Sequence, residues 1–163
     1  MSGSGSVALG RLQDAFPGAL VATHADLGDA TAVVDPARLV EVMRFLRDDE
    51  ATAFEMLMDL TAVDLLGRAE PRFEVVYHLY SVARGHRLRV KARVPEPEPR
   101  VASVTPVWPG ANWMEREVWD LYGIRFEGHP DLRRLLLYEE FEGHPLRKDY
   151  PKTGRQPLIG PGS

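Results

Sequence analysis

Two neighbouring stretches decide the fold: Arg72–Tyr80 (RFEVVYHLY) and Arg87–Val94 (RLRVKARV), separated by a turn at Arg84-Gly85. In the second stretch apolar residues alternate strictly with arginine and lysine, and successive side chains of a strand point to opposite faces. The first stretch has apolar residues at both parities, which is typical of a strand buried on both faces. The sequence therefore predicts an antiparallel hairpin whose second strand has a basic outer face, Arg87 to Arg93.

The residues before this hairpin predict short strands and helices. A helix should end at Pro17-Gly18, and strands at 20–23 and 31–34 should flank a turn. Asp35-Pro36 is a good helix start, with a capping side chain before a proline at the first helical position. A strand is favoured within 54–66. We therefore predict an α+β fold, a mostly antiparallel sheet with helices packed on one face, plus an extended C-terminal tail. The second helix should bury Leu39, Val42, Met43 and Leu46.

Composition divides the chain into five parts. Residues 1–6 form a Gly/Ser-rich flexible leader, and 7–94 form the α+β domain. Residues 95–111 are a proline-rich connection whose first part, Pro95–Pro99, should be stiff and extended. Residues 112–140 are a helical segment, and 141–163 are an extended tail that should dock on a partner.

Charge and cysteine content exclude several classes of site. The net charge of −4 over 163 residues does not favour nucleic acid as a partner. The absence of cysteine excludes disulfides, thiolate zinc sites and iron–sulfur clusters held by this chain. No apolar run approaches the ~20 residues of a membrane span. Membrane contact is therefore expected only through a partner.

The region from Asn112 to Tyr122 is predicted to be a helix that ends at Gly123. Asn112 is the expected cap, with Glu115 completing a capping box. Arg116 and Asp120 have the spacing of an ordinary helix ion pair. Paired carboxylates on this helix could also suit a hydrolase, but a partly buried helix with neutralised charges is favoured.

The phrase Phe-Glu-Gly-His-Pro occurs twice, at 126–130 and 141–145, and a leucine and an arginine soon follow each copy. His129, His144 and the carboxylates near Glu117 could form the metal site of a small hydrolase. Glycine and the residue before proline both restrict the backbone, however, so two joints are favoured. The first should start a short helix at Pro130 whose buried face is Leu132, Leu135 and Leu136. The second should turn the chain and launch the tail.

Within 112–151, the segments 112–136 (NWMEREVWDLYGIRFEGHPDLRRLL) and 141–151 (FEGHPLRKDYP) resemble a known signature. It is that of the 30-kilodalton subunit family of respiratory NADH:quinone oxidoreductase (complex I), whose bacterial member is the C subunit. The stretches 59–64, 73–79 and 103–108 fit the same family, so the resemblance covers most of 19–152. The match is dense enough to be far more specific than a single short motif.

This resemblance implies a non-catalytic α+β subunit of the peripheral arm, on the cytoplasmic side of the bacterial inner membrane. Its partners would be other peripheral-arm subunits, chiefly the quinone-site subunit, and it would brace the quinone module during electron transfer from NADH to quinone. FMN, iron–sulfur clusters and quinone would be bound by partner subunits, and no cofactor, catalytic or metal residue is expected in this chain. The expected partner interface comprises Trp113, Glu117, Trp119, Tyr122, Phe126, His129, Arg133, Arg134, Phe141, His144, Leu146, Arg147, Lys148 and Tyr150.

Three other functions remain open from the sequence. The chain could be the equivalent subunit of a membrane-bound hydrogenase-type complex, since such complexes share the domain. Less favoured are the small metal-dependent hydrolase and a binding module that docks acidic partners on the Arg87–Arg93 face.

Overall fold

The computed structural model describes residues 4–156 and residue 159. Its helices are α1 (Ser4–Ala15), α2 (Leu39–Asp48) and α3 (Ala111–Tyr122), with 3-10 turns η1 (Asp26–Gly28) and η2 (Pro36–Arg38). Its strands are β1 (Leu20–His24), β2 (Thr31–Val34), β3 (Met56–Asp64), β4 (Phe73–Ser81), β5 (His86–Val94), β6 (Arg100–Ala102) and β7 (Arg125–Glu127).

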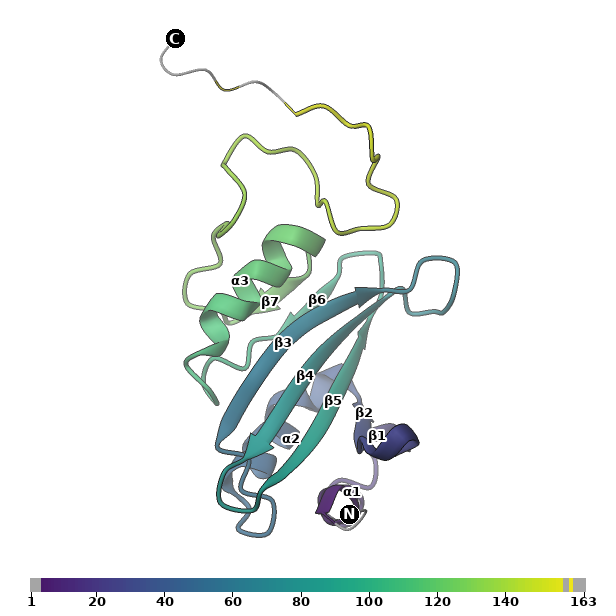
Figure 1. Cartoon of the computed structure of the whole chain (residues 1–163), viewed down its shortest axis with the longest axis vertical. Coiled ribbons are helices and arrows are strands. Elements are labelled where there is room, and N and C mark those ends of the chain that lie inside the picture. The colour runs from purple at the N-terminus through teal and green to yellow at the C-terminus, as the bar shows by residue number, and fades with distance from the viewer. Residues whose placement is uncertain (1–3, 157–158, 160–163) are drawn as a thin grey trace.

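The five-stranded sheet has the order β1-β2-β5-β4-β3. Three of its four strand pairs are antiparallel, and the β2–β5 pair is parallel. The predicted hairpin is its centre: β4 and β5 pair from Phe73 opposite Val94 to Ser81 opposite His86. A separate parallel pair, β6 with β7, lies beside α3 (Figure 1). The predicted α+β class and mostly antiparallel sheet are confirmed.

One face of this sheet carries the core. The alternating residues Leu88, Val90, Ala92 and Val94 of β5 are buried, and the arginines and lysine between them are not. Leu12 of α1, Leu46 of α2 and Val118 of α3 belong to the same buried apolar cluster. Figure 1 shows α2 behind the strands and α3 alongside β3. The helices therefore pack on one face, as predicted.

The N-terminal elements follow local rules closely. The Asp35 carboxylate accepts a hydrogen bond from the Ala37 N–H at 2.9 Å, and Pro36 follows it, so the predicted helix start is confirmed. The first turn is 3-10, and α2 then buries its predicted stripe. Residues 4–6 of the expected flexible leader are helical, because α1 begins at Ser4; residues 1–3 lie outside the described part.

The connection after β5 bends where a straight segment was predicted. The chain turns at residues 96–98, and Glu98 has a φ of 52°. The bend lets Glu96 reach Arg72 and lets the chain return as β6. Long-range charge pairing thus overrides the stiffness of alternating prolines.

The predicted start of α3 is wrong in detail, and its end is confirmed. Gly110 occupies the N-cap position without a side-chain hydrogen bond, and Asn112 lies inside the helix. The Glu115 carboxylate bonds outside the helix, to Ser103 and Val104. Gly123 ends the helix in the left-handed conformation, with φ 73°.

The predicted helix after Pro130 does not form. Residues 130–140 contain bends and turns, and Leu136 is 61% exposed rather than part of a buried face. The tail lacks helix and strand as far as residue 156, as expected, and its residues 157–158 and 160–163 lie outside the described part. The backbone of 133–137 is held by α3 side chains, which compete with a local helix.

Alanine substitutions at Gly123 and Gly10 should have opposite effects on stability, because only Gly123 is closely packed. A Cβ at Gly123 would lie 2.5 Å from Nε2 of His144, in a backbone conformation that is strained for other residues. Gly123→Ala should therefore lower the free energy of unfolding by about 2 kcal/mol. Urea denaturation of the purified chain measures this.

Gly10→Ala is the matched control, because a Cβ there meets nothing within 4 Å and lies inside α1. It should stabilise the chain by about 0.5–1 kcal/mol. Equal effects of the two substitutions would contradict the close packing of Gly123.

Candidate protein-docking site

The predicted interface residues lie on α3, on β7 and on the segment that follows. Phe126 and the side chain of His129 are buried within the chain, so they stabilise it and cannot contact a partner. Trp113 is 60% exposed. The exposed members are Trp113, Glu117, Arg133, Leu146 and Lys148, and the half-buried ones are Trp119, Tyr122, Arg134, Phe141, His144, Arg147 and Tyr150.

The first Phe-Glu-Gly-His-Pro copy holds the beginning of α3. The His129 Nδ1 atom accepts a hydrogen bond from the Asp131 N–H at 3.0 Å. The proton of this neutral ring is therefore on Nε2, which donates to the Asn112 carbonyl at 3.1 Å. Gly128 has the positive φ, 79°, that the turn requires. The first copy therefore forms a turn that redirects the chain, as predicted. It bonds to the beginning of α3, however, and starts no helix of its own.

The second copy holds the end of α3. The last carbonyls of a helix have no partner within it. Here His144 Nδ1 donates to the Asp120 carbonyl at 3.0 Å and the Leu146 N–H to Leu121 at 3.1 Å. Arg147 Nε donates to the Tyr122 carbonyl at 2.6 Å, where a cation also favours the helix dipole. Burial lowers the pKa of His144, which keeps the ring neutral.

The two histidines do not share a site. They bond to residues eight positions apart on α3, or about 12 Å along the helix. Within the described residues, no group of three histidines or carboxylates is placed to hold a metal ion. The pair required by the hydrolase alternative is therefore not assembled.

Asp120 fixes the segment after Pro130. Its buried Oδ2 accepts hydrogen bonds from three consecutive backbone N–H groups, those of 135, 136 and 137, at 2.8–3.1 Å. Arg134 pairs with Oδ1 at 3.2 Å, and Arg116 donates to the carbonyls of 133 and 134. The predicted Arg116–Asp120 pair is wrong, because both side chains hold the neighbouring segment instead.

This arrangement projects apolar side chains from a fixed backbone. Leu136 is exposed beside α3, and Trp113 carries the Arg116 guanidinium over its ring at 5.1 Å. Sequence reasoning missed Leu136 and Tyr138 as surface residues, because it placed 130–136 in a helix. The conformation of 133–137 depends on Asp120, whose partners are 14–17 residues away. Nothing local in the sequence indicates these bonds.

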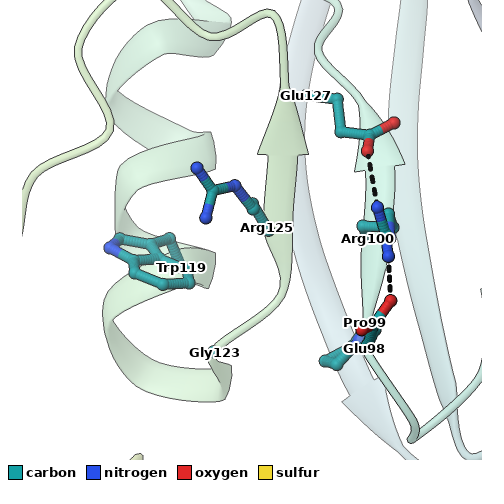
Figure 2. A pocket seen from close by; sticks show the side chains of 7 residues that line it. All are labelled: Glu98, Pro99, Arg100, Trp119, Gly123, Arg125 and Glu127. Atoms are coloured by element: carbon teal, nitrogen blue, oxygen red, sulfur yellow. Dashed lines mark hydrogen bonds and ion pairs between the residues drawn. The ribbon is translucent and has the colours of Figure 1, made fainter.

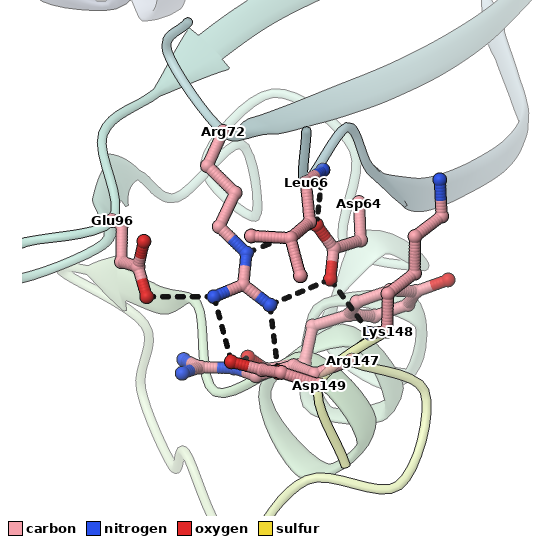
Figure 3. Close-up of polar contacts among 8 residues, drawn as sticks. Asp64, Leu66, Arg72, Glu96, Arg147, Lys148 and Asp149 are labelled. Atoms are coloured by element: carbon pink, nitrogen blue, oxygen red, sulfur yellow. Dashed lines mark hydrogen bonds and ion pairs between the residues drawn. The ribbon is translucent and has the colours of Figure 1, made fainter. Parts of the chain in front are cut away.

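Arg72 joins four parts of the chain (Figure 3). Its side chain is 1% exposed and pairs with Asp64 through Nε at 3.0 Å and Nη2 at 2.8 Å. Its Nη1 also reaches Glu96 at 2.6 Å, and both Nη atoms reach Asp149 at 2.7–3.0 Å. Asp64 in turn accepts the Lys148 N–H at 2.8 Å. This arginine holds the pKa of Asp64 and of Asp149 below the usual range.

The start of the tail therefore docks on its own domain. Residues 144–149 are held by α3, Arg72 and Asp64, although the sequence suggested that this tail needs a partner's surface. On either side of this stretch lie Phe141 and Tyr150, whose rings stack with centres 6.2 Å apart. Sequence reasoning missed Arg72 and Asp64, because nothing local indicates that Arg72 also pairs with Asp149, 77 residues away.

A groove of about 380 Å³ lies between α3 and the β6–β7 pair (Figure 2). Trp119 and Arg125 extend into it from α3 and β7. On its other side Arg100 is bound to Glu98 and Glu127. The groove could take an apolar or acidic side chain of a partner.

The model for a family described as the 30-kilodalton subunit of respiratory-chain NADH dehydrogenase matches residues 32–156. The chain belongs to this family. The NADH-quinone oxidoreductase C subunit of Roseiflexus castenholzii is 54% identical over 143 residues, covering 88% of this chain and 82% of that protein. The corresponding C subunit of Geobacter sulfurreducens is 45% identical over 152 residues, covering 92% and 93%.

Two solved structures share the fold of this 30-kilodalton family member. A trypsin-resistant fragment of Nqo5 is 38% identical with a TM-score of 0.64, covering 77% of this chain and 99% of the fragment. A chain of an archaeal membrane-bound sulfane sulfur reductase is 25% identical with a TM-score of 0.77, covering 91% and 86%. Among the described residues, no helix is long and apolar enough to span a membrane.

Removing the Arg72 guanidinium tests the ion pairs that hold the tail on the domain, here called the clasp: those of Arg72 with Asp64, Glu96 and Asp149. Arg72→Met leaves the buried Asp64 carboxylate without a counter-ion, which should lower the free energy of unfolding by about 3–5 kcal/mol. Asp149→Asn is the comparison, since its half-exposed carboxylate contributes less than about 1 kcal/mol. It should instead raise amide hydrogen exchange in 144–150. Similar destabilisation by both would contradict the central role of Arg72.

Glu115 is the buried acid beneath the start of α3. Its carboxylate accepts hydrogen bonds from Ser103 Oγ and the Val104 N–H, both at 2.7 Å. His129 Nε2 lies 3.9 Å from Oε2, and the buried Tyr77 also senses this charge. Burial raises the pKa of Glu115 to about 7, although its hydrogen bonds oppose the rise.

The raised pKa predicts a pH-dependent stability. A folded-state pKa above the unfolded value favours folding fully below about pH 4.5 and loses that contribution as the pH rises through 7. Glu115→Gln should remove this dependence, so the variant's stability relative to the wild type should rise between pH 5 and 8, by about 1–3 kcal/mol. Urea denaturation at each pH measures this. A constant difference would contradict it.

Proposed function

We propose that this chain is the 30-kilodalton-family subunit of an NADH-quinone oxidoreductase and serves as a non-catalytic brace for the quinone module in its peripheral arm. The observation that carries the proposal is the docking surface: exposed apolar side chains and arginines on α3 and 131–150, projected from a backbone pinned by Asp120. A backbone that is already held loses little conformational entropy on binding, so this part of the surface is preorganised for a partner.

The chemistry of this surface suits a protein partner. Trp, Tyr and Arg are the residues enriched at the energetic centres of protein interfaces. Trp113 supplies an exposed aromatic ring, and Arg133 an exposed cation that can bond carboxylates. Leu136 and Leu146 add exposed apolar area. Exposed aromatic, aliphatic and cationic side chains on α3 and on 131–150 are therefore suited to docking a protein.

The redox groups belong, in this proposal, to the partner subunits. The chain has no cysteine to hold an iron–sulfur cluster. FMN, the clusters and quinone would thus be bound by other peripheral-arm subunits, of which the quinone-site subunit is the chief partner. This chain would lie on the cytoplasmic side of the inner membrane and contact it only through the complex.

A related membrane-bound complex is the second candidate. The sulfane sulfur reductase chain shares the fold over 91% of this chain. Its identity of 25% is about half that of the Roseiflexus castenholzii protein, at 54%. The higher identity favours the NADH-quinone oxidoreductase.

Trp113 gives the sharpest test of the docking surface. Trp113→Ala should weaken association by about 2 kcal/mol or more, roughly 30-fold, because the exposed indole is the largest apolar group there. The assay tags another subunit of the oxidoreductase and measures the fraction of this chain that co-purifies. Val21→Ala, at an exposed apolar position of β1, is the control and should leave that fraction unchanged.

Point substitutions are more informative here than removal of the tail. Deleting 141–163 also removes Asp149 and the caps of α3, so the domain itself would change. If Trp113→Ala and Leu136→Ala both co-purify as the wild type does, this surface is not the brace.

A further inference from the structure

The second face of the sheet has no helix over it at β3, β4 and β5 among the described residues (Figure 1), although Glu74 and Val76 on this face are buried. Strand register defines four cross-strand rows on it. From one end to the other they are Met56–Tyr80–Arg87, Asp59–His78–Arg89, Thr61–Val76–Lys91 and Val63–Glu74–Arg93. In Figure 1 these strands lie in front, with α2 behind them.

The three strands give this face two chemical columns. The β5 column is basic at four successive outward positions, Arg87 to Arg93. The β3 column is apolar at its two ends, where Met56 is 49% and Val63 40% exposed, and polar between them at Asp59 and Thr61. Met58, exposed at the irregularity between Leu57 and Asp59, extends the apolar edge. A solvated sheet face usually carries polar residues throughout, so the three exposed apolar side chains of β3 mark a surface suited to a partner.

The basic column is incompletely neutralised by the chain itself. Glu74 serves two cations, Lys91 at 2.8 Å and Arg93 at 3.6 Å, and Asp29 serves Arg89 at 3.2 Å. Arg87 lies against the Tyr80 ring at 5.7 Å and has no carboxylate partner among the described residues. The four cations of β5 face three carboxylates: Asp29, Glu74 and Asp59. This face therefore has an excess of positive charge, although the chain's net charge is −4.

We propose that this face docks an amphipathic helix of another subunit, with its carboxylates on β5 and its apolar side on β3. The surface is separate from the α3 docking site and goes beyond the brace described above. Bound on both sides, the chain would join two partners.

The dimensions of a helix fit the two columns. From β5 to β3 is two strand spacings, about 10 Å, which is also the diameter of a helix with side chains. Cations at alternate positions of β5 lie about 7 Å apart, and carboxylates at i and i+4 of a helix about 6 Å. A helix laid along β4 therefore meets both columns at once.

The chain has no native cysteine, so a single introduced cysteine can report directly whether a partner covers the sheet face. Val63→Cys is placed on the face, and Val7→Cys, on exposed α1 with 45% exposure, is the control. The assembled oxidoreductase is treated with N-ethylmaleimide, and mass spectrometry of this chain gives the alkylation rate relative to the urea-unfolded sample. We expect at least tenfold more protection at Val63→Cys than at Val7→Cys.

The covering segment is identified by zero-length cross-linking. Arg87→Lys keeps the charge and supplies an amine, and Arg44→Lys on α2 is the control. Carbodiimide joins such an amine to a carboxylate in contact. The proposal expects Arg87→Lys to link to an Asp or Glu in a helical segment of another subunit, in excess of the control.

Each outcome decides the proposal. Equal protection at the two cysteines, or a cross-link only to a second copy of this chain, overturns it. If Val63→Cys does not assemble, Met56→Cys at the other end of the β3 column gives the same comparison. Trp113→Ala tests the α3 site alone. A negative result with that variant would therefore contradict the brace and leave the docking of a helix on the sheet face to be decided by its own experiments.

Discussion

The buried guanidinium of Arg72 is the constraint on which the chain's long-range order depends. A charge removed from water needs counter-ions and filled hydrogen bonds, and unpaired it would cost several kcal/mol. Asp64 alone gives two bonds; Glu96 and Asp149 fill the rest. The connection after β5 must therefore bend, and the tail must return to the sheet. One side chain thus sets the paths of two segments that contain little regular structure.

The end of α3 sets the second requirement, which the second copy of the repeated phrase meets. Near the start of α3 the first copy bonds a carbonyl, that of Asn112, and no unpartnered N–H. A helix leaves donors at its start and acceptors at its end without internal partners. Each copy places a histidine beside one end, but with the proton on opposite ring nitrogens: Nε2 in His129 and Nδ1 in His144. Glycine supplies the positive φ in both turns, at Gly128 and Gly143. Identical local sequences can therefore do opposite jobs, because their neighbours decide which ring atom is protonated.

What could be predicted from the sequence follows from the distance over which each cause acts. The Asp35 cap, the alternation of β5 and the stop at Gly123 depend on residues within one turn or strand, and all were predicted. The partners of Glu115 and Asp120 lie 11–17 residues away, and those of Arg72 lie 8, 24 and 77 residues away. A capping box and an i, i+4 pair were the best local uses for Glu115 and Asp120, and both predictions were wrong. The interface residues expected from the family resemblance stay a prediction, and the geometry around Asp120 and Arg72 needed the fold.

In the proposed interface, the ion pairs around Arg72 would link folding to assembly. Asp149 and Glu96 are half-exposed, so in the free chain water and salt weaken their pairing with the guanidinium. A partner that covers residues 141–150 excludes that water and strengthens the same ion pairs without new contacts to them. By linkage, whatever tightens the clasp must also favour the partner. If the tail is part of the interface, as proposed, it is ordered before binding and would gain further stability in the complex.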